Sequence, residues 1–593
     1  MKNKVLLILI LILAFCLRLA GFNWDSGFHF HPDERMLIMV AERITFWTQL
    51  NPDFFNYGSL PIYLLRGTSQ LLDLIFNSTL ANYDGMLFVG RSLSTIADLI
   101  VVFLIYHISF HISHKKTIAL WSSFFYAIAF FPIQNSHFFI VDTFLNLFST
   151  LLMYLLLMYR DQPSYKKVCM IGIVFAAALT SKISAVIFLP VIGLTFILPF
   201  EKHENIFQKI FHLFQRKPTK IRPYILYSLF NILLFSLCTL IFGFLFMPYA
   251  FIEYIRFLSD ISQQVKMNSD AYIFPYTLQY VGTLPYWYYI KNIFLWGLGP
   301  VISTLAIIGI IVCIRKYLPY FPSLPRRGIE GVASFTIFLL FYLIYFIIIG
   351  KSAVKFMRYM LPLYPFFAIM AGYGVYVILN FVQNRTIHVI PSELVRSEVE
   401  GVEGSTFISR FRITSEMTMI IVLPTLLWTF MFLNIYSTQN TRIQATEWIN
   451  QFIPYGSTLA TEHWDDRVPI YDPGNYQYEE LTLYDIPDDD QKWKIINQKI
   501  DRSDYIVIAS NRLYTPLQRL DNCEKTFPRC YPKTSEYYQK LLNNKLNFIK
   551  VAEFTSYPRF CLLPDMCYMI RDDSSDESFT VYDHPQIMIF KKI

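Results

Sequence analysis

The chain has 593 residues, of which 54% are hydrophobic and only 16% are charged, and its mean hydropathy is +0.38. Water-soluble domains carry about 25% charged residues, so most of this chain is expected to lie in lipid. The formal charge of +7 does not indicate a nucleic-acid-binding protein, because the basic residues form short clusters between apolar runs. Cytoplasmic loops of membrane proteins have this pattern.

The first apolar run reaches to about Phe22 and has two lysines near its start. No small-residue cleavage site closes it, and Arg18 lies near its far end. We therefore predict an uncleaved first membrane span; a cleaved signal peptide is the alternative.

Crossing a membrane takes about 20 apolar residues, and such runs recur through residues 1–436. The candidate spans are 4–22, 88–110, 117–134, 138–159, 224–247, 293–314, 332–350, 360–380 and 416–436. Segment 168–200 is too long for one helix, and both of its flanks are basic, so it is expected to cross and return as two short spans or a re-entrant pair that turns at Thr180-Ser181-Lys182. The sequence therefore predicts about eleven spans, with the N-terminus inside and everything after about residue 437 outside.

Three segments are expected on the outer side: 23–87, 248–292 and the tail. Residues 33–48 place apolar side chains on roughly one helical face, which predicts a helix lying flat in the membrane interface. These side chains are Met36, Leu37, Met39, Val40, Ile44 and Trp47. Residues 272–291 are dense in aromatic side chains. This density is typical of an interfacial belt, with a platform for sugar or lipid as the alternative.

The tail, residues 437–593, has frequent charges and short apolar runs, which predicts a small extracytoplasmic α/β domain. The expected strands are 457–460, 505–509 and 587–590, and the expected helices are 441–452 and 535–543.

Four of the eight cysteines lie in the tail: Cys523, Cys530, Cys561 and Cys567. In an oxidising compartment they are candidates for two disulfides. The spacing allows local pairs, 523 with 530 and 561 with 567, but sequence does not fix the connectivity. A zinc site is the alternative.

The adjacent carboxylates Asp33 and Glu34 follow Pro32 at the start of the first outer segment. Acidic residues in the first turn of a helix also complement its dipole, which is a purely structural explanation. Glycosyl transfer to a hydroxyl, in contrast, needs a base for the acceptor proton and cations for the departing phosphate.

Basic side chains at the outer face oppose the positive-inside trend, and the sequence predicts five of them there: Arg91, Lys182, Lys351, Lys355 and Arg358. Snorkelling to lipid headgroups explains Lys351. Functional roles are expected for Arg91, Lys182 and Arg358. Asp142, near the outer end of the fourth span, is expected either to pair with such a cation or to take part in function.

The order of these motifs resembles that of the C superfamily of membrane glycosyltransferases, which use polyprenyl-phosphate sugars and include the protein O-mannosyltransferases and the lipid A aminoarabinose transferases. The matching pieces are Arg18-Leu19, His31-Pro32-Asp33-Glu34, Asn56-Tyr57-Gly58-Ser59-Leu60-Pro61, Gly90-Arg91-Ser92-Leu93-Ser94, Ser136-His137-Phe138, Thr180-Ser181-Lys182 and Arg358-Tyr359-Met360-Leu361-Pro362. The tail is similar to that of a prokaryotic subgroup, through pieces such as Ser503-Asp504-Tyr505-Ile506-Val507 and Asp583-His584-Pro585.

This resemblance implies a polytopic α-helical membrane domain of the C superfamily type over residues 1–436, followed by the extracytoplasmic α/β domain. It implies that Asp33 is the catalytic base, with Glu34 as its neighbour, and that Arg91 is a phosphate ligand. The other residues assigned to the carrier phosphate or the sugar are Lys182, Arg358, Asp142, His137 and Tyr57. No metal or other cofactor is expected, although Asp33, Glu34 and Asp142 could converge on a divalent cation.

The predicted function is inverting transfer of a hexosyl or pentosyl group from a polyprenyl-phosphate-linked sugar to an acceptor hydroxyl at the extracytoplasmic face. The acceptor is a lipid, a glycan or a protein, and the expected location is a bacterial or archaeal cytoplasmic membrane. A lipid or glycan transporter or flippase is the main alternative, but transporters often show paired halves with interrupted helices, and only one interrupted pair is visible here. A receptor or assembly module is a third hypothesis.

Overall fold

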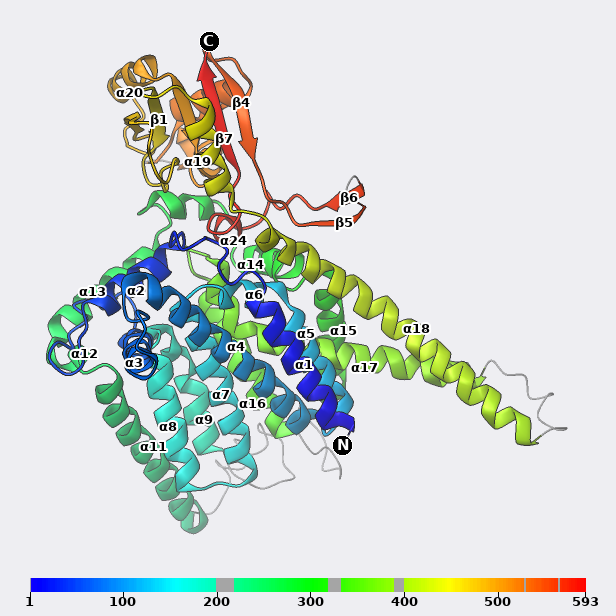
Figure 1. The fold of residues 1–593 in the computed structure, drawn as a ribbon. Helices are drawn as coiled ribbons and strands as arrows, with labels where there is room; N and C mark the ends of the chain where they lie inside the picture. The colour runs from blue at the N-terminus through cyan, green and yellow to red at the C-terminus, as the bar shows by residue number, and fades with distance from the viewer. Residues whose placement is uncertain (1, 199–217, 318–331, 389–398, 527–528, 564–565) are drawn as a thin grey trace.

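The computed structural model describes residues 2–198, 218–317, 332–388, 399–526, 529–563 and 566–593. Figure 1 shows a bundle of helices below and a small α/β domain above it. Helices lie on all the predicted spans: α1 (Lys2–Leu19), α4 (Tyr83–Ser113), α5 (Lys116–Ile128) with α6 (Phe130–Ser136), α7 (Val141–Asp161), α8 (Tyr165–Leu179), α9 (Leu189–Ile197), α11 (Pro218–Phe246), α15 (Pro300–Tyr317), α16 (Val332–Gly350), α17 (Tyr364–His388) and α18 (Val399–Leu433).

Within the described residues, six helices are long and apolar enough to cross a membrane, and the α5–α6 pair, bent by 56°, raises the number to seven. Helices α8 and α9 are short for a bilayer about 30 Å thick. The chain is therefore a polytopic helical membrane protein, while eleven crossings stay a prediction.

The interruption predicted in segment 168–200 lies where α8 ends. The Thr180 and Ser181 hydroxyls donate back to the carbonyls of Ala176 and Ala177, both at 2.8 Å. Lys182 then takes an extended conformation before the 3₁₀ helix η1 (Ile183–Phe188). Because no water is available in lipid, the free carbonyls at such a break need protein donors, and the outer loop supplies them, as described below.

The outer segments form short helices at the end of the bundle that faces the α/β domain (Figure 1). They are α2 (Pro32–Glu42), α3 (Ser59–Phe76), α12 (Tyr249–Ile252), α13 (Tyr254–Ser269), the 3₁₀ helix η2 (Pro275–Tyr280), α14 (Trp287–Asn292), the π-helical turn η3 (Ile293–Gly297) and the 3₁₀ helix η5 (Met357–Leu363).

The predicted interfacial helix over 33–48 is too long, and its predicted face is only partly right. Helix α2 ends at Glu42; Leu37, Val40 and Ile44 of that face are buried, whereas Met36, Met39 and Trp47 are exposed. Ile38 and Ala41, outside the predicted face, are buried as well. The buried residues continue the i, i+3, i+4, i+7 stripe that begins at Glu34 and pack in one core with α3 and α4. An ion pair of Glu34, not apolar periodicity alone, decides which face turns inward.

The tail forms a five-stranded sheet in the order β2-β1-β3-β7-β4. Strands β1 (Thr458–Glu462), β2 (Gln477–Leu481) and β3 (Tyr505–Ile508) are parallel, and β7 (Ile587–Lys592) runs antiparallel to β3 and β4 (Phe548–Phe554). The predicted strands and helices of the tail are present.

Helices cover both faces of this sheet. Helix α19 (Thr441–Phe452) packs on one face, and α20 (Asp490–Arg502) and α23 (Pro532–Leu542) pack on the other. The remaining elements are α21 (Tyr514–Leu517), α22 (Cys523–Thr526), α24 (Glu577–Thr580), the 3₁₀ helix η7 (Asn434–Ser437) and a hairpin of β5 (Arg559–Leu563) and β6 (Met566–Met569).

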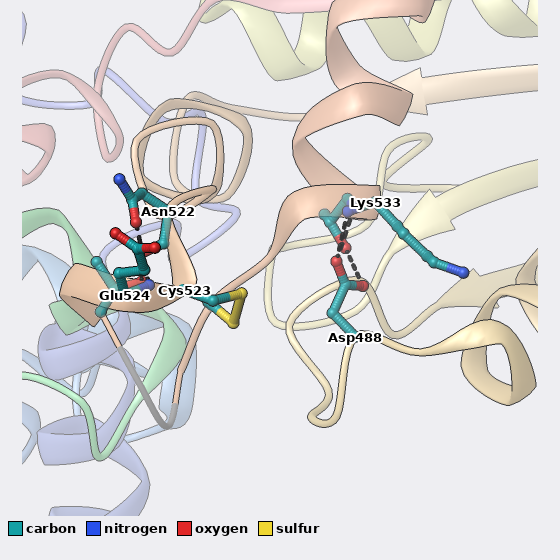
Figure 2. The surroundings of a disulfide bond; sticks show 8 residues. Asp488, Asn522, Cys523, Glu524 and Lys533 are labelled. Atoms are coloured by element: carbon teal, nitrogen blue, oxygen red, sulfur yellow. Dashed lines mark hydrogen bonds between the residues drawn. A yellow bond between two sulfur atoms is a disulfide. The ribbon is translucent and has the colours of Figure 1, made fainter.

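The four tail cysteines form two local disulfides, Cys523–Cys530 and Cys561–Cys567, so they are not zinc ligands. Figure 2 shows the first bond near the start of α23. There the Asp488 carboxylate accepts the backbone N–H groups of Lys533 and Thr534 at 2.8 and 3.0 Å. The carboxylate thereby satisfies donors that a helix start leaves unpaired.

A buried polar cluster joins the tail to the bundle. The Asp583 carboxylate accepts from Gln134 of α6 at 2.9 Å and from the Tyr436 hydroxyl at 2.8 Å. Its neighbour His584 lies between Asp583 and Asp572. Although burial opposes the charged form, the two carboxylates raise the pKa of His584 to about 10.

The aromatic stretch 272–291 serves this junction rather than forming a simple belt. Tyr280 and Tyr289 are buried, and the Tyr288 hydroxyl donates to Asp576 of the tail at 2.8 Å.

The His584 cluster predicts a loss of stability in alkali. Because the pKa is raised above its ordinary value of 6.5, the stabilisation is complete below pH 6.5 and is lost as the pH rises to about 10. The melting temperature of purified protein in detergent should fall over this range, and most of that fall should be absent in His584→Gln. His463→Gln, which changes an exposed histidine of the same domain, should behave like wild type. Equal slopes for wild type and His584→Gln would contradict the assignment.

Candidate active site

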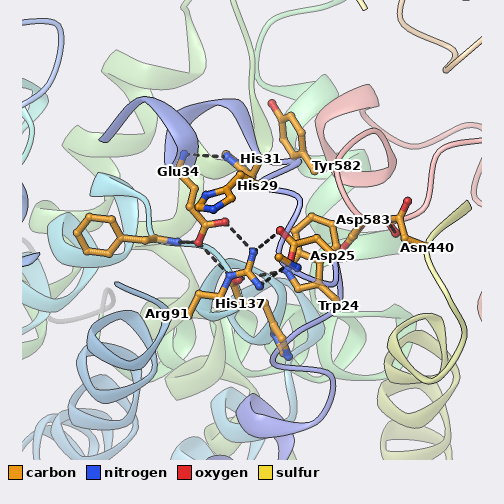
Figure 3. A network of polar contacts seen from close by, with 12 residues as sticks. Trp24, Asp25, His29, His31, Glu34, Arg91, His137, Asn440, Tyr582 and Asp583 are labelled. Atoms are coloured by element: carbon orange, nitrogen blue, oxygen red, sulfur yellow. Dashed lines mark hydrogen bonds and ion pairs between the residues drawn. The ribbon is translucent and has the colours of Figure 1, made fainter. Parts of the chain in front are cut away.

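Arg91 of α4 lies at the centre of a closed, fully buried charge cluster. Nε and Nη2 donate to the Glu34 carboxylate at 3.0 and 2.8 Å. Nη1 and Nη2 donate to Asp25 at 3.0 and 2.8 Å, and Nη1 also donates to the carbonyl of Phe22 at 3.0 Å. Figure 3 shows both carboxylates turned toward the guanidinium. A guanidinium has five N–H donors, so Arg91 keeps none for a ligand.

The sequence around Arg91 makes this cluster compact. A Cβ on Gly90 would lie 2.7 Å from the ring of Phe139, so only glycine allows that ring so close. The backbone N–H of Phe139 in turn donates to Glu34 at 2.8 Å. Gly90-Arg91 and the segment before α7 therefore hold Glu34 together.

The two carboxylates at the start of α2, those of Asp33 and Glu34, point in different directions. His31 caps the helix, its Nδ1 accepting the N–H of Glu34 at 3.4 Å, and Pro32 occupies the first turn. Burial, together with the charge of Arg358, lowers the pKa of His31 well below its ordinary value, so the ring is neutral and can accept. Successive residues of a helix point about 100° apart, so with Glu34 in the buried cluster Asp33 faces another group.

That group is a chain of alternating charges at the outer end of the bundle. The Asp33 carboxylate lies 2.6 Å from Nη1 of Arg358. Arg358 is also 4.0 Å from Asp142, which accepts a hydrogen bond from Lys182 at 2.6 Å. All four side chains are mostly buried, with exposed fractions between 2% and 18%.

Arg358 differs from Arg91 in how its donors are used. Its Nη1 atom is buried, yet no aligned hydrogen-bond acceptor meets it among the described residues, despite the close carboxylate. The guanidinium lies over the ring of Phe356 at 4.8 Å, and the Lys182 ammonium lies over the ring of Tyr359 at 4.3 Å. Both cations thus rest on aromatic faces, with donor capacity left for an anion.

Gly58 allows the first outer loop to pack directly against the helix break beside this site. Its N–H donates to the carbonyl of Ser181 at 3.2 Å, and the N–H of Leu60 donates to that of Thr180 at 3.1 Å. A Cβ on Gly58 would lie 1.9 Å from the Thr180 oxygen. Tyr57 is next in the chain, and burial followed by the Asp33 charge raises its pKa well above the ordinary value, so it stays a neutral phenol.

The tail domain covers the outer side of the site. A small cavity beside Arg358 is lined by His31, Phe131, Gln134, Asn135, Phe138, Ser578 and Tyr582. One ion pair joins the tail to the bundle here: Arg35 of α2 with Asp466 at 3.2 Å. Within the tail, Arg512 pairs with Glu577 at 2.7 Å, and the other oxygen of Glu577 accepts a hydrogen bond from Gln279 at 2.9 Å. The carboxyl ends of β1 and β3 therefore face the bundle.

A larger, almost wholly apolar groove of about 260 Å³ lies among η3, α15, α16 and α17. Its lining includes Ile293, Leu298, Ile310, Leu343, Phe346 and Leu363. Leu363 and Arg358 share the 3₁₀ helix η5, so the groove lies about 10 Å along the chain from the buried cation.

The structure therefore brings together Asp33, Asp142, Lys182, Arg358 and Tyr57 but separates the other predicted residues from them. Glu34 and Arg91 neutralise each other in the closed cluster. His137 is fully buried, and its two ring nitrogens lie 2.8 and 2.7 Å from the carbonyls of Ile133 and Ala20.

Sequence reasoning missed Asp25 and the tail residues Ser578 and Tyr582. Asp25 is a single acid near a span end, and only the finding that Arg91 is buried would have called for a second partner. The contacts between the tail residues and the bundle join positions that are hundreds of residues apart in the sequence, so no local sequence pattern predicts them.

Within the described parts of the chain, no group of three or more His, Cys, Asp or Glu side chains is placed to hold a metal ion. Asp33 and Asp142 each face a cation instead. The donor set as folded does not fit a divalent cation, which would have to displace Arg358 or Lys182.

Comparison with known proteins gives a family match and a fold. Residues 80–215 match the family described as dolichyl-phosphate-mannose-protein mannosyltransferase, over less than a quarter of the chain. A search of curated proteins finds no match.

Among solved structures, the archaeal oligosaccharyltransferase AglB from Archaeoglobus fulgidus, in complex with an inhibitory peptide and a dolichol-phosphate, is 11% identical with a TM-score of 0.50. The match covers 100% of this chain and 88% of that one. The same enzyme tethered to an acceptor peptide gives 10% identity, a TM-score of 0.51 and the same coverage. ArnT from Cupriavidus metallidurans bound to undecaprenyl phosphate is 12% identical with a TM-score of 0.42, covering 86% of this chain and 94% of that one.

The resemblance to the C superfamily of membrane glycosyltransferases is confirmed. At these identities the AglB structures show the fold alone. The arrangement seen here, a helical membrane domain with a C-terminal α/β region, is similar to the fold of AglB.

The two buried arginines predict different responses to the same substitution. Arg91→Lys should destabilise the protein strongly, because one ammonium cannot replace four hydrogen bonds to two buried carboxylates and a fifth to a backbone carbonyl; breaking a buried ion pair costs about 3–5 kcal/mol. Arg358→Lys should leave the melting temperature close to wild type. Thermal unfolding of both variants in the same detergent checks this, and an Arg91→Lys variant as stable as Arg358→Lys would contradict it.

Proposed function

We propose that the protein transfers a glycosyl group from a polyprenyl-phosphate-linked sugar to an acceptor hydroxyl at the extracytoplasmic face of the membrane, with Asp33 as the base. The observation that carries this proposal is a partly accessible carboxylate, Asp33, 2.6 Å from the buried guanidinium of Arg358, with the Lys182 ammonium in the same chain of charges through Asp142. Such an arrangement supplies both a proton acceptor and a site for the charge that develops on a departing phosphate.

Arg358 and Lys182 are the proposed phosphate ligands, and this assignment replaces the one predicted for Arg91. Their rings, Phe356 and Tyr359, keep water from one side of each cation. In a site of low dielectric constant their attraction for a phosphate dianion is stronger than it would be in water. Arg91 with Glu34 and Asp25 has a positioning role, since it fixes the start of α2.

The apolar groove supports a lipid-linked donor. It is open along lipid-facing helices and is lined almost entirely by hydrocarbon and aromatic side chains. An isoprenoid chain lying there would bring its phosphate toward η5, which carries Arg358. AglB, whose fold is similar, has been solved with a dolichol-phosphate.

In the proposed reaction the acceptor oxygen attacks the anomeric carbon as Asp33 takes the acceptor proton. The new C–O bond forms as the bond from the anomeric carbon to the phosphate oxygen breaks, with inversion. Polyprenyl phosphate leaves with the electron pair and is held by Arg358 and Lys182. Cationic side chains here do the work of a metal ion, so we expect metal-independent activity.

Asp33→Asn tests the role of the base. Transfer of radiolabelled sugar from a polyprenyl-phosphate donor by purified protein should fall about 10²–10⁴-fold, with normal expression and lipid binding. Glu42→Gln, which changes an exposed acid at the other end of α2, should retain activity. Wild-type turnover by Asp33→Asn would remove Asp33 from the mechanism.

Two arms of the same assay test the rest of the proposal. Activity should survive a chelator; loss restored by manganese would contradict the metal-independent mechanism. Movement of the lipid without any transfer of sugar would favour the transporter alternative.

A further inference from the structure

The hairpin of β5 and β6 stands apart from the five-stranded sheet. Figure 1 shows it projecting sideways from the base of the α/β domain, above the end of α18. The Cys561–Cys567 disulfide joins its two strands at a directly paired position. A two-stranded ribbon is marginally stable in water, so the cross-link helps explain how it persists away from the sheet.

The hairpin exposes apolar side chains to an unusual degree. All described residues of both strands are exposed, including Leu562 at 68% and Tyr568 at 69%. The other large apolar side chains are Phe560, Leu563, Met566 and Met569. Because adjacent residues of a strand point to opposite faces, Tyr568 and Met569, in the regularly paired part of β6, show that both faces of the ribbon are apolar. A protein partner usually covers one face, whereas a lipid surface can surround both.

Position joins this apolar surface to the lipid-facing side of the bundle. The Arg559 Nε atom donates to Asn434 at 3.3 Å, directly where α18 ends. The preceding turns of α18 expose Leu423, Leu427 and Phe430 outward from a helix apolar enough to span the membrane. The ribbon therefore begins at the level where that helix leaves the bilayer.

Charge and side-chain type at the hairpin fit the same surface. Arg559 and Arg571 flank the apolar stretch at its base and are exposed, Arg571 in an ion pair with Asp573 at 2.9 Å. Exposed guanidinium groups at this level can meet lipid phosphates. Tyr568 belongs to the aromatic types that are enriched at the boundary between lipid and water. Exposed apolar patches rimmed by polar residues mark interaction sites.

We propose that the β5–β6 hairpin is a membrane-interface anchor, inserting its apolar side chains among the headgroups and upper acyl chains of the outer leaflet. It holds the α/β domain against the membrane beside α18. The occupant of this surface is the phospholipid bilayer itself. The anchor is separate from the proposed active site and does not depend on the proposed chemistry.

Site-specific photocrosslinking in the full-length protein tests this proposal. A benzoylphenylalanine replaces Leu562 in one variant and Tyr568 in another, and each protein is reconstituted into vesicles of phosphatidylethanolamine and phosphatidylglycerol with its disulfides intact. After illumination, mass spectrometry should find phospholipid adducts at both positions. The melting temperature of each variant, which should match wild type, shows that the domain is folded.

Two further positions serve as controls. Phe430 on the exposed side of α18 should give lipid adducts, and Ile495, 53% exposed on α20 at the far side of the domain, should give none. Adducts at Phe430 but not at 562 or 568 would overturn the proposal. Crosslinks from 562 or 568 to a second copy of the chain, in place of lipid, would overturn it as well.

Discussion

The hydrogen-bonded ion pairs of Arg91 with Asp25 and Glu34 are the interaction on which the rest of the site depends. They tie the loop after α1 and the first turn of α2 to α4 through hydrogen bonds that are all buried. Removing either carboxylate would leave two of these guanidinium hydrogen bonds without an acceptor in a buried place, which is costly. Because Glu34 is fixed in this cluster, the preceding carboxylate of Asp33 is aimed at the opposite side, toward Arg358.

The second group of charges, around Arg358, is paired less completely than the one around Arg91. Asp33, Arg358, Asp142 and Lys182 balance one another in number, yet among the described residues Nη1 of Arg358 lies close to Asp33 without an aligned hydrogen bond. Loose pairing here and tight pairing at Arg91 separate the residues that would bind a phosphate from those that hold the scaffold.

Hydropathy and basic loops predicted the helical bundle, the break at Thr180-Lys182 and the tail domain, because these features are local. The same reasoning grouped Arg91 with Arg358 and Glu34 with Asp33. Sequence identifies which residues are charged at the outer end of the bundle, but not which carboxylate faces which cation. That pairing is set by glycines 58 and 90, whose missing side chains allow backbone and ring to approach. The face of α2 was predicted only in part for a related reason, since an acid on the apolar stripe is hidden until its arginine partner is known.

A structure of the protein with a bound polyprenyl phosphate tests the central claim most directly. The account predicts phosphate oxygens within hydrogen-bond distance, about 3 Å, of Arg358 and Lys182, with the isoprenoid chain in the groove between α15, α16 and α17. Asp33 would then face the acceptor side of the same pocket. Phosphate density beside Arg91, or at any place remote from Asp33, would contradict it.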